Sequence, residues 1–186
     1  MKLAFLALFS ALAFAQPQLT VSTSSPVYPG ATLNVTVTLS GSAGSNISAI
    51  GFALPGGSAA LTSSVSGKFA FTNGNNALLV GFNNGTGNDT AYSDGPVATF
   101  TYTVPTASPA GIGLIVALAS PLASNTSGGV VTISSQAFSG IVGLSSTCVN
   151  AIQSAITSYL AAPSQTLLGQ ITADLSTALT GGSCAQ

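Results

Sequence analysis

Two aspartates form the only close pair of acidic residues in the chain. Asp89 and Asp94 lie in the polar segment 83–95, and two carboxylates that flank a sugar can hydrolyse a glycosidic bond. Asn, Asp and Gly, which dominate this segment, are also the ordinary residues of turns. A glycoside-active site at these two residues is therefore a remote alternative to a plain turn.

The same segment carries oxygen ligands of the kind that Ca²⁺ accepts. These are the amides of Asn83, Asn84 and Asn88 and the carboxylates of Asp89 and Asp94. Their spacing is not that of an EF-hand, and only two of the groups are anionic. A weak calcium or ligand loop and a solvated turn both stay open here, and no other cofactor is expected.

The residue types that are missing exclude most enzyme chemistry. Only five of the 186 residues are charged, two lysines and three aspartates, and the chain has no His and no Glu. A Ser-His-Asp triad, an H-E-x-x-H zinc site and any imidazole ligand are therefore impossible. One lysine, Lys68, lies outside the first 15 residues, which is too little positive charge to bind nucleic acid. The composition predicts a protein that is not an enzyme.

The first 15 residues, MKLAFLALFSALAFA, predict a signal peptide. One lysine precedes an apolar run, and Ala13-Phe14-Ala15 has the small-x-small pattern of a cleavage site. The longest later apolar stretch, 112–119, has the length of a strand and ends before Pro121. We expect a protein that is secreted or held at the cell surface, with no membrane span once the leader is removed.

Residues 16–142 show the period-two pattern of strands. Apolar residues alternate with Thr and Asn in 33–39, with Thr in 98–104, and recur at every second position in 112–118. Shorter strands are expected at 19–23, 47–54, 69–71, 77–82 and 130–133, with turn residues between them. About nine such strands predict a mainly β fold, a jelly-roll β-sandwich whose outward residues are Thr, Ser and Asn.

Residues 143–186 change to a helical period and predict a C-terminal two-helix hairpin. Apolar residues recur every three or four positions over 147–161 and 164–180, with Ser146 or Thr147 as the first N-cap. An antiparallel hairpin brings Cys148 and Cys184 together, and a secreted chain permits their oxidation. A disulfide is favoured over two free thiols, since two Cys without His cannot complete a zinc site.

Three further segments carry recognisable patterns. They are the Pro-Gly pair and alternating strand of 27–37, the segment 46–52, and the Asp-Gly turn with its Ala-x-Phe strand in 94–102. Together these segments resemble the cohesin domain, the β-sandwich module that anchors enzymes on bacterial surfaces. Order and spacing are similar over about 18–137. The resemblance implies a nine-stranded jelly roll that binds a protein partner, typically a dockerin, on one sheet face.

These observations favour a non-catalytic extracellular module for protein–protein or carbohydrate-related attachment at the cell surface. Neutral hydroxyl and amide groups can hydrogen-bond a polysaccharide, and a surface with so little net charge tends to associate. The alternative is a homo-oligomer, a self-assembling subunit of a surface filament, layer or virion decoration formed by strand addition at sheet edges.

Overall fold

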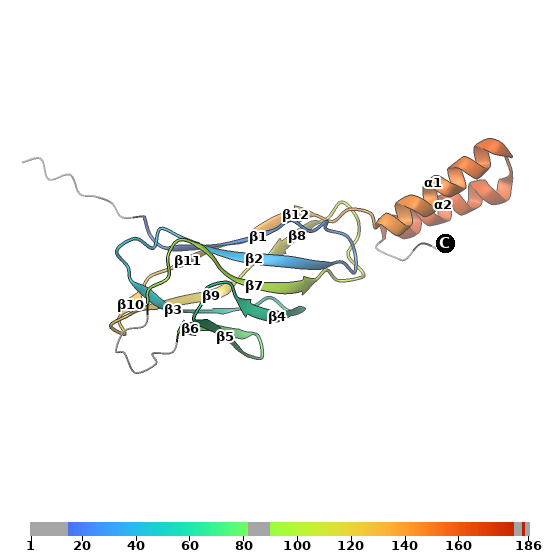
Figure 1. Ribbon diagram of the computed structural model, residues 1–186. Helices are drawn as coiled ribbons and strands as arrows, with labels where there is room; N and C mark the ends of the chain where they lie inside the picture. Colours follow the sequence, from blue (N-terminus) through green and yellow to red (C-terminus); the bar gives the residue numbers. More distant parts are fainter. Residues whose placement is uncertain (1–14, 82–89, 181–183, 185–186) are drawn as a thin grey trace, which may run out of the picture.

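The computed structural model describes residues 15–81, 90–180 and 184, and shows two five-stranded sheets packed as a sandwich with a helical hairpin beyond them (Figure 1). The first sheet, here the β2 sheet, has the order β11 (Ser134–Gln136), β1 (Gln18–Thr23), β2 (Thr32–Ser40), β7 (Gly95–Thr103) and β4 (Ser58–Ser63). The second, the β3 sheet, has the order β10 (Val130–Val131), β9 (Ala119–Asn125), β3 (Ile47–Ala53), β6 (Asn76–Gly81) and β5 (Lys68–Asn73). A separate ribbon pairs β12 (Phe138–Ile141) with β8 (Gly113–Val116). The prediction of a mainly β sandwich is confirmed.

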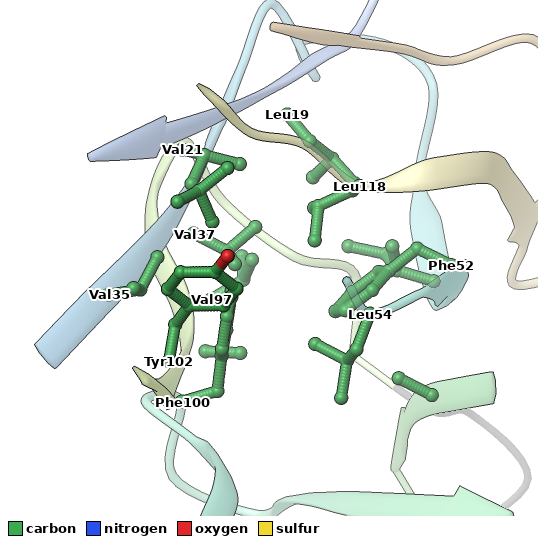
Figure 2. Close-up of a cluster of buried hydrophobic side chains, with 14 of the residues drawn as sticks. Leu19, Val21, Val35, Val37, Phe52, Leu54, Val97, Phe100, Tyr102 and Leu118 are labelled. Carbon is green, nitrogen blue, oxygen red and sulfur yellow. The ribbon is translucent and has the colours of Figure 1, made fainter. Parts of the chain in front are cut away.

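The core lies between the two sheets and follows from the alternation in the sequence. On β2 the apolar residues Leu33, Val35, Val37 and Leu39 are fully buried, while the residues between them lie on the other face. Val97 and Phe100 of β7 and Phe52 of β3 complete the contact (Figure 2). Burying each large apolar side chain contributes about 1.5–3 kcal/mol, so this layer holds the sandwich together.

The structure departs from the expected single strand at 112–118. This segment divides into β8, which pairs with β12, and a crossing that leads to β9, which pairs with β3. Ile112 is exposed, whereas Leu114, Val116 and Leu118 are buried. The alternation predicted the inward side chains of Leu114, Val116 and Leu118 correctly and that of Ile112 wrongly, because period two alone does not say where a chain enters one pair of strands or leaves it for another.

Strand β4 (Ser58–Ser63) has no counterpart in the predicted set. Its sequence, SAALTS, has no clean alternation, and none of its residues is fully buried. It forms because it lies at the edge of the β2 sheet, where β7 supplies the hydrogen bonds on one side. With β11 and β12 also added, the described residues contain twelve strands, more than the nine expected.

The C-terminal helices are α1 (Ser146–Ala161) and α2 (Gln165–Leu179). Ser145 is the N-cap of α1, because its hydroxyl accepts from the Cys148 N–H at 3.2 Å; the expected caps, Ser146 and Thr147, were one and two residues too late. Ser164 caps α2 in the same way. The hairpin extends from one end of the sandwich (Figure 1).

A disulfide closes the base of this hairpin. Cys148 is bonded to Cys184, with their Cα atoms 5.0 Å apart, as the hairpin spacing predicts. The bonded cysteines and Ala178 form a small buried cluster separate from the core of the sandwich. Neither α1 nor α2, the helices of the described chain, is long and apolar enough to cross a membrane.

Candidate binding surface

The outer face of the β2 sheet carries hydroxyl groups, as the alternation predicts. Register places Ser22, Thr36, Thr99 and Thr62 in one row across β1, β2, β7 and β4. The hydroxyls of Thr62 and Thr99 share a hydrogen bond with 2.8 Å between their Oγ1 atoms. This face is polar and uncharged.

The outer face of the β3 sheet is different, because its outward residues are apolar. Register aligns Phe71 of β5, Leu78 of β6, Gly51 of β3 and Leu122 of β9 in one row. Phe71 and Leu78 are nearly half exposed, and Leu122 is 66% exposed. The expectation of a Ser, Thr and Asn exterior is therefore wrong for this sheet. On these strands apolar residues lie on both faces, so alternation did not reveal an outward apolar face.

A second row extends the same apolar face. It runs from Phe69 through Val80 and Ala49 to Ser124 and Val130. Phe69 is 49% exposed and Val130 is 87% exposed. We call the two rows together the β3-sheet face. Isolated exposed apolar residues are ordinary, but a contiguous group of them is typical of a site of interaction.

The relief of the β3-sheet face is shallow. A hollow of about 240 Å³ lies along the β5–β6 hairpin, lined in part by Phe71, Asn76 and Leu78. Gly51 leaves a gap in the centre of the first row, where an added Cβ would make only ordinary contacts, the nearest 3.7 Å from the Ala77 carbonyl oxygen. A broad and shallow apolar surface fits another protein better than it fits a small molecule.

The single lysine of the sandwich does not lie on this face. Lys68 begins β5 but points inward and is 6% exposed. Its ammonium donates to the carbonyl oxygens of Ser48, at 3.4 Å, and of Thr90, and lies 4.6 Å from the centre of the Tyr92 ring. From the sequence, Lys68 counts only as one of the few charged residues, because nothing in the residues around it indicates that its side chain is buried. Its contacts bind β5 to the rest of the sandwich.

The side chain of Asp94 links two loops of the chain by hydrogen bonds. Its carboxylate accepts from the Gly41 N–H at 3.0 Å, the Ser42 N–H at 2.8 Å and the Ser42 hydroxyl at 2.6 Å. The Ser42 hydroxyl foremost, and then the backbone N–H groups, lower the pKa of this carboxyl below its ordinary value. These bonds join the end of β2 to the start of β7.

The proposed calcium or ligand loop stays a prediction. Asn83, Asn84, Asn88 and Asp89 lie outside the described residues, so the carboxylate pair of Asp89 and Asp94 has no geometry here. Among the residues that the structure does describe, no three Cys or Asp side chains gather in a way that could hold a metal ion.

We expect Asp94→Ala to destabilise the sandwich by about 1–2 kcal/mol. A hydrogen bond to a charged group contributes about 1.5–3 kcal/mol, and the exposure of Asp94 reduces that figure. Because the folded carboxyl has the lower pKa, the contribution is fully present above about pH 4 and is lost as the pH falls through the folded pKa. Urea unfolding at neutral and acidic pH measures it.

The matched control is Ser93→Ala, an exposed neighbour that we expect to change stability by less than about 0.5 kcal/mol at either pH. A difference between Asp94→Ala and the parent chain that stayed constant down to about pH 2 would contradict a role for the ionised carboxylate.

Among known proteins, similar folds are found but no similar sequences. No protein-family description and no curated protein matches this chain by sequence. Among solved structures, the third cohesin of ScaC from Acetivibrio cellulolyticus, in complex with the ScaB dockerin, superposes with a TM-score of 0.54 at 14% identity over 69% of this chain and 99% of that one. The fold is cohesin-like.

Two other solved cohesins agree with this assignment. The sixth cohesin of scaffoldin B from Acetivibrio cellulolyticus, in complex with a Cel5 dockerin, gives a TM-score of 0.51 at 16% identity, over 70% of this chain and all of the cohesin. A non-cellulosomal cohesin from the archaeon Archaeoglobus fulgidus gives 0.50 at 12% identity, over 69% and 91%. Each cohesin is matched over nearly its full length, so the cohesin-like fold does not account for the whole chain.

Proposed function

We propose that this chain is a non-catalytic extracellular binding module whose ligand surface is the β3-sheet face. The observation that carries the proposal is the contrast between the sheets, since one outer face presents hydroxyls and the other presents Phe69, Phe71, Leu78 and Leu122. The cohesin-like fold supports a protein-binding role, because two of the similar cohesins were solved in complex with dockerins. The absence of His and Glu supports a role without catalysis.

The chemistry of the face indicates the kind of partner that fits it. Nothing charged projects from the β3-sheet face within the described part of the chain, since the ammonium of Lys68 is buried. A partner held by ion pairs would find no counter-charge there. We infer an uncharged protein surface with apolar anchors that bury Leu78 and Leu122, as in the dry centre of an interface.

The test compares binding by the parent protein and by Leu122→Glu. We expect the variant to bind at least about tenfold more weakly, because the interface would have to bury an unpaired carboxylate. The partner is first captured from the culture medium of the source organism, and its affinity for the purified protein is then measured by interferometry.

Two control variants sharpen this experiment. Thr103→Glu places the same charge on an exposed residue of the hydroxyl face, and we expect it to leave the affinity unchanged. Gly51→Ala adds one methyl group to the β3-sheet face without a clash, so a change in affinity would report direct contact at the centre. Equal loss of binding in Thr103→Glu and Leu122→Glu would contradict the assignment of the face.

The hydroxyl face of the β2 sheet supports a second candidate, carbohydrate-related attachment. The row of Ser22, Thr36, Thr99 and Thr62 offers neutral donors and acceptors at the regular spacing of a sheet. Thr99→Val removes one hydroxyl while it keeps the shape of the side chain. Binding on a glycan array that Thr99→Val lowers and Leu122→Glu leaves intact would favour this candidate.

An extracellular location agrees with the proposed role. The disulfide between Cys148 and Cys184 is the kind of bond that persists in oxidising compartments. The apolar run of residues 1–15 supports export of the chain. Mass measurement of the protein purified from the culture medium tests this, and an N-terminus at Gln16 is expected.

A further inference from the structure

One side of the helical hairpin is apolar and uncovered. On α1 the buried residues Cys148 and Ala155 face α2, and each is followed directly by an apolar residue, Val149 or Ile156. Successive residues of a helix are rotated by about 100°, so these two lie to one side of the helix contact. Leu160, four residues beyond Ile156, extends the stripe and is 75% exposed.

Helix α2 repeats this arrangement. Its buried residues Asp174 and Ala178 are followed by Leu175 and Leu179, which are about half exposed, and Leu168 lies on the same side about two turns before Leu175. The two helices are antiparallel, so the same offset from the contact places both stripes on the same side of the hairpin. We call this side the apolar hairpin side; its members are Val149, Ile156, Leu160, Leu168, Leu175 and Leu179.

The opposite side of the hairpin is polar. A groove of about 370 Å³ runs between the helices there, lined by Asn150, Ser154, Ser158 and Gln170 among others. A helix in water needs only one apolar face to pack, and each helix already uses its contact with the other. The exposed stripes are therefore additional to what the hairpin needs for its own folding.

The lack of charged residues on the hairpin indicates which kind of partner covers the apolar hairpin side. α1 has no charged residue, and the one charged residue of α2, Asp174, is buried. Helices that lie on membranes depend on Lys and Arg along the polar face, and this hairpin has neither. Because the hairpin has no exposed charged residue, it cannot select a charged partner by ion pairs. A second copy of the chain offers the same uncharged apolar surface and is not repelled.

The size of the surface agrees with a dimer. α1 has 16 residues, which makes it about 24 Å long, and two helices side by side are about 20 Å wide. Two such faces together bury about 1,000 Å², the lower bound for a specific interface. Four helices packed in this way enclose a core, as in a four-helix bundle.

We propose that the apolar hairpin side is a dimerisation surface, on which the hairpins of two copies pack into a four-helix bundle. The contact is isologous, so each copy presents the same residues to the other about a two-fold axis. The disulfide fixes the base of each hairpin before the copies meet, which lowers the entropy lost on association. The β3-sheet face takes no part and stays open for a partner.

Sedimentation equilibrium of the purified protein over about 1 to about 300 µM tests the proposal. We expect a monomer–dimer equilibrium with a dissociation constant of about 10 µM, in keeping with the small interface. Leu160→Glu and Leu175→Glu, which place a carboxylate on exposed positions, should each raise that constant at least about tenfold. Circular dichroism confirms that both variants keep their helices.

Two further variants make the outcome decisive. Ser154→Glu adds the same charge to the polar side of α1, and the dimer should persist. Leu122→Glu on the β3-sheet face should also leave it intact, so that failure of the proposed function and failure of this proposal are distinguished. A monomer at every concentration, dissociation caused by Ser154→Glu, or dissociation caused by Leu122→Glu alone would each overturn the hairpin dimer.

Discussion

Reduction of the bond between Cys148 and Cys184 is expected to unfold the helical hairpin while the sandwich stays folded. The two residues are 36 positions apart, and closing a loop of that length removes about 4 kcal/mol of chain entropy from the unfolded state. The small buried cluster at the bond is separate from the core of the sandwich. The loss should therefore fall on the hairpin alone.

The hairpin depends on this bond because little else stabilises it. Helices of 16 and 15 residues are marginal in water by themselves. Its buried residues are Cys148, Ala155, Asp174 and Ala178, and two of these are alanines that bury little apolar area. The Oδ2 atom of Asp174 is buried and accepts no hydrogen bond from the described residues. An unsatisfied buried polar group of this kind destabilises a fold by about 1–3 kcal/mol.

Far-ultraviolet circular dichroism with and without a reductant measures this prediction. We expect loss of the helical signal on reduction, with the near-ultraviolet signal of the buried Tyr92 and Tyr102 unchanged. The double variant Cys148→Ser with Cys184→Ser should match the reduced protein. A full helical signal in protein shown by mass to be completely reduced would mean that packing, and not the bond, maintains the hairpin.

The elements that rest on local pattern were predictable. In β2 the alternation of Leu33, Val35, Val37 and Leu39 showed both the strand and its buried side. The change to a period of three to four marked both helices to within a residue or so at each end. The cysteines then followed from geometry, because an antiparallel hairpin must bring the start of α1 near the end of α2.

The candidate site was not predictable, because it depends on which strands become neighbours. Phe71 and Leu78 lie on neighbouring strands of the β5–β6 hairpin, whereas Leu122 lies on β9, far away in sequence, and only the register of the β3 sheet places all three in one row. On β6 and β9 apolar residues also lie on the inward face, so neither strand shows a clean alternation; on β5 the inward face includes Lys68, so the alternation does not show that its Phe residues lie outside. The inward orientation of the Lys68 side chain could not be predicted either, because the polarity of a lysine by itself predicts an exposed side chain.

Replacing that lysine should give the second large effect. We expect Lys68→Met to destabilise the sandwich by about 2–5 kcal/mol, because a donor to the carbonyl oxygens of Ser48 and Thr90 is lost while both remain inside. Ser48 lies at a register shift of β3 against β9, between Ile47 and Ala49, where the side chain of Lys68 supplies a bond from outside the regular ladder. Urea unfolding of the variant measures the loss.

Comparison with a second variant separates hydrogen bonding from packing. Met keeps most of the length of the lysine stem, whereas Lys68→Ala also opens a cavity and should be the less stable of the two. Thr72→Met, on an exposed residue of the same strand, is the matched control and should change stability by less than about 0.5 kcal/mol. A Lys68→Met protein as stable as its parent would show that the carbonyl groups do not depend on the ammonium.

The same variant connects the inside of the sandwich to its proposed surface. Lys68 points inward from β5 while Phe69 and Phe71 of that strand point outward, so the bonds of the lysine also hold these two aromatic rings in place. We therefore expect Lys68→Met to weaken partner binding as well as stability, although Lys68 touches no partner. Leu122→Glu should weaken binding without a comparable loss of stability, because its side chain is already 66% exposed. The pair of variants thus distinguishes a residue that positions the β3-sheet face from one that forms it.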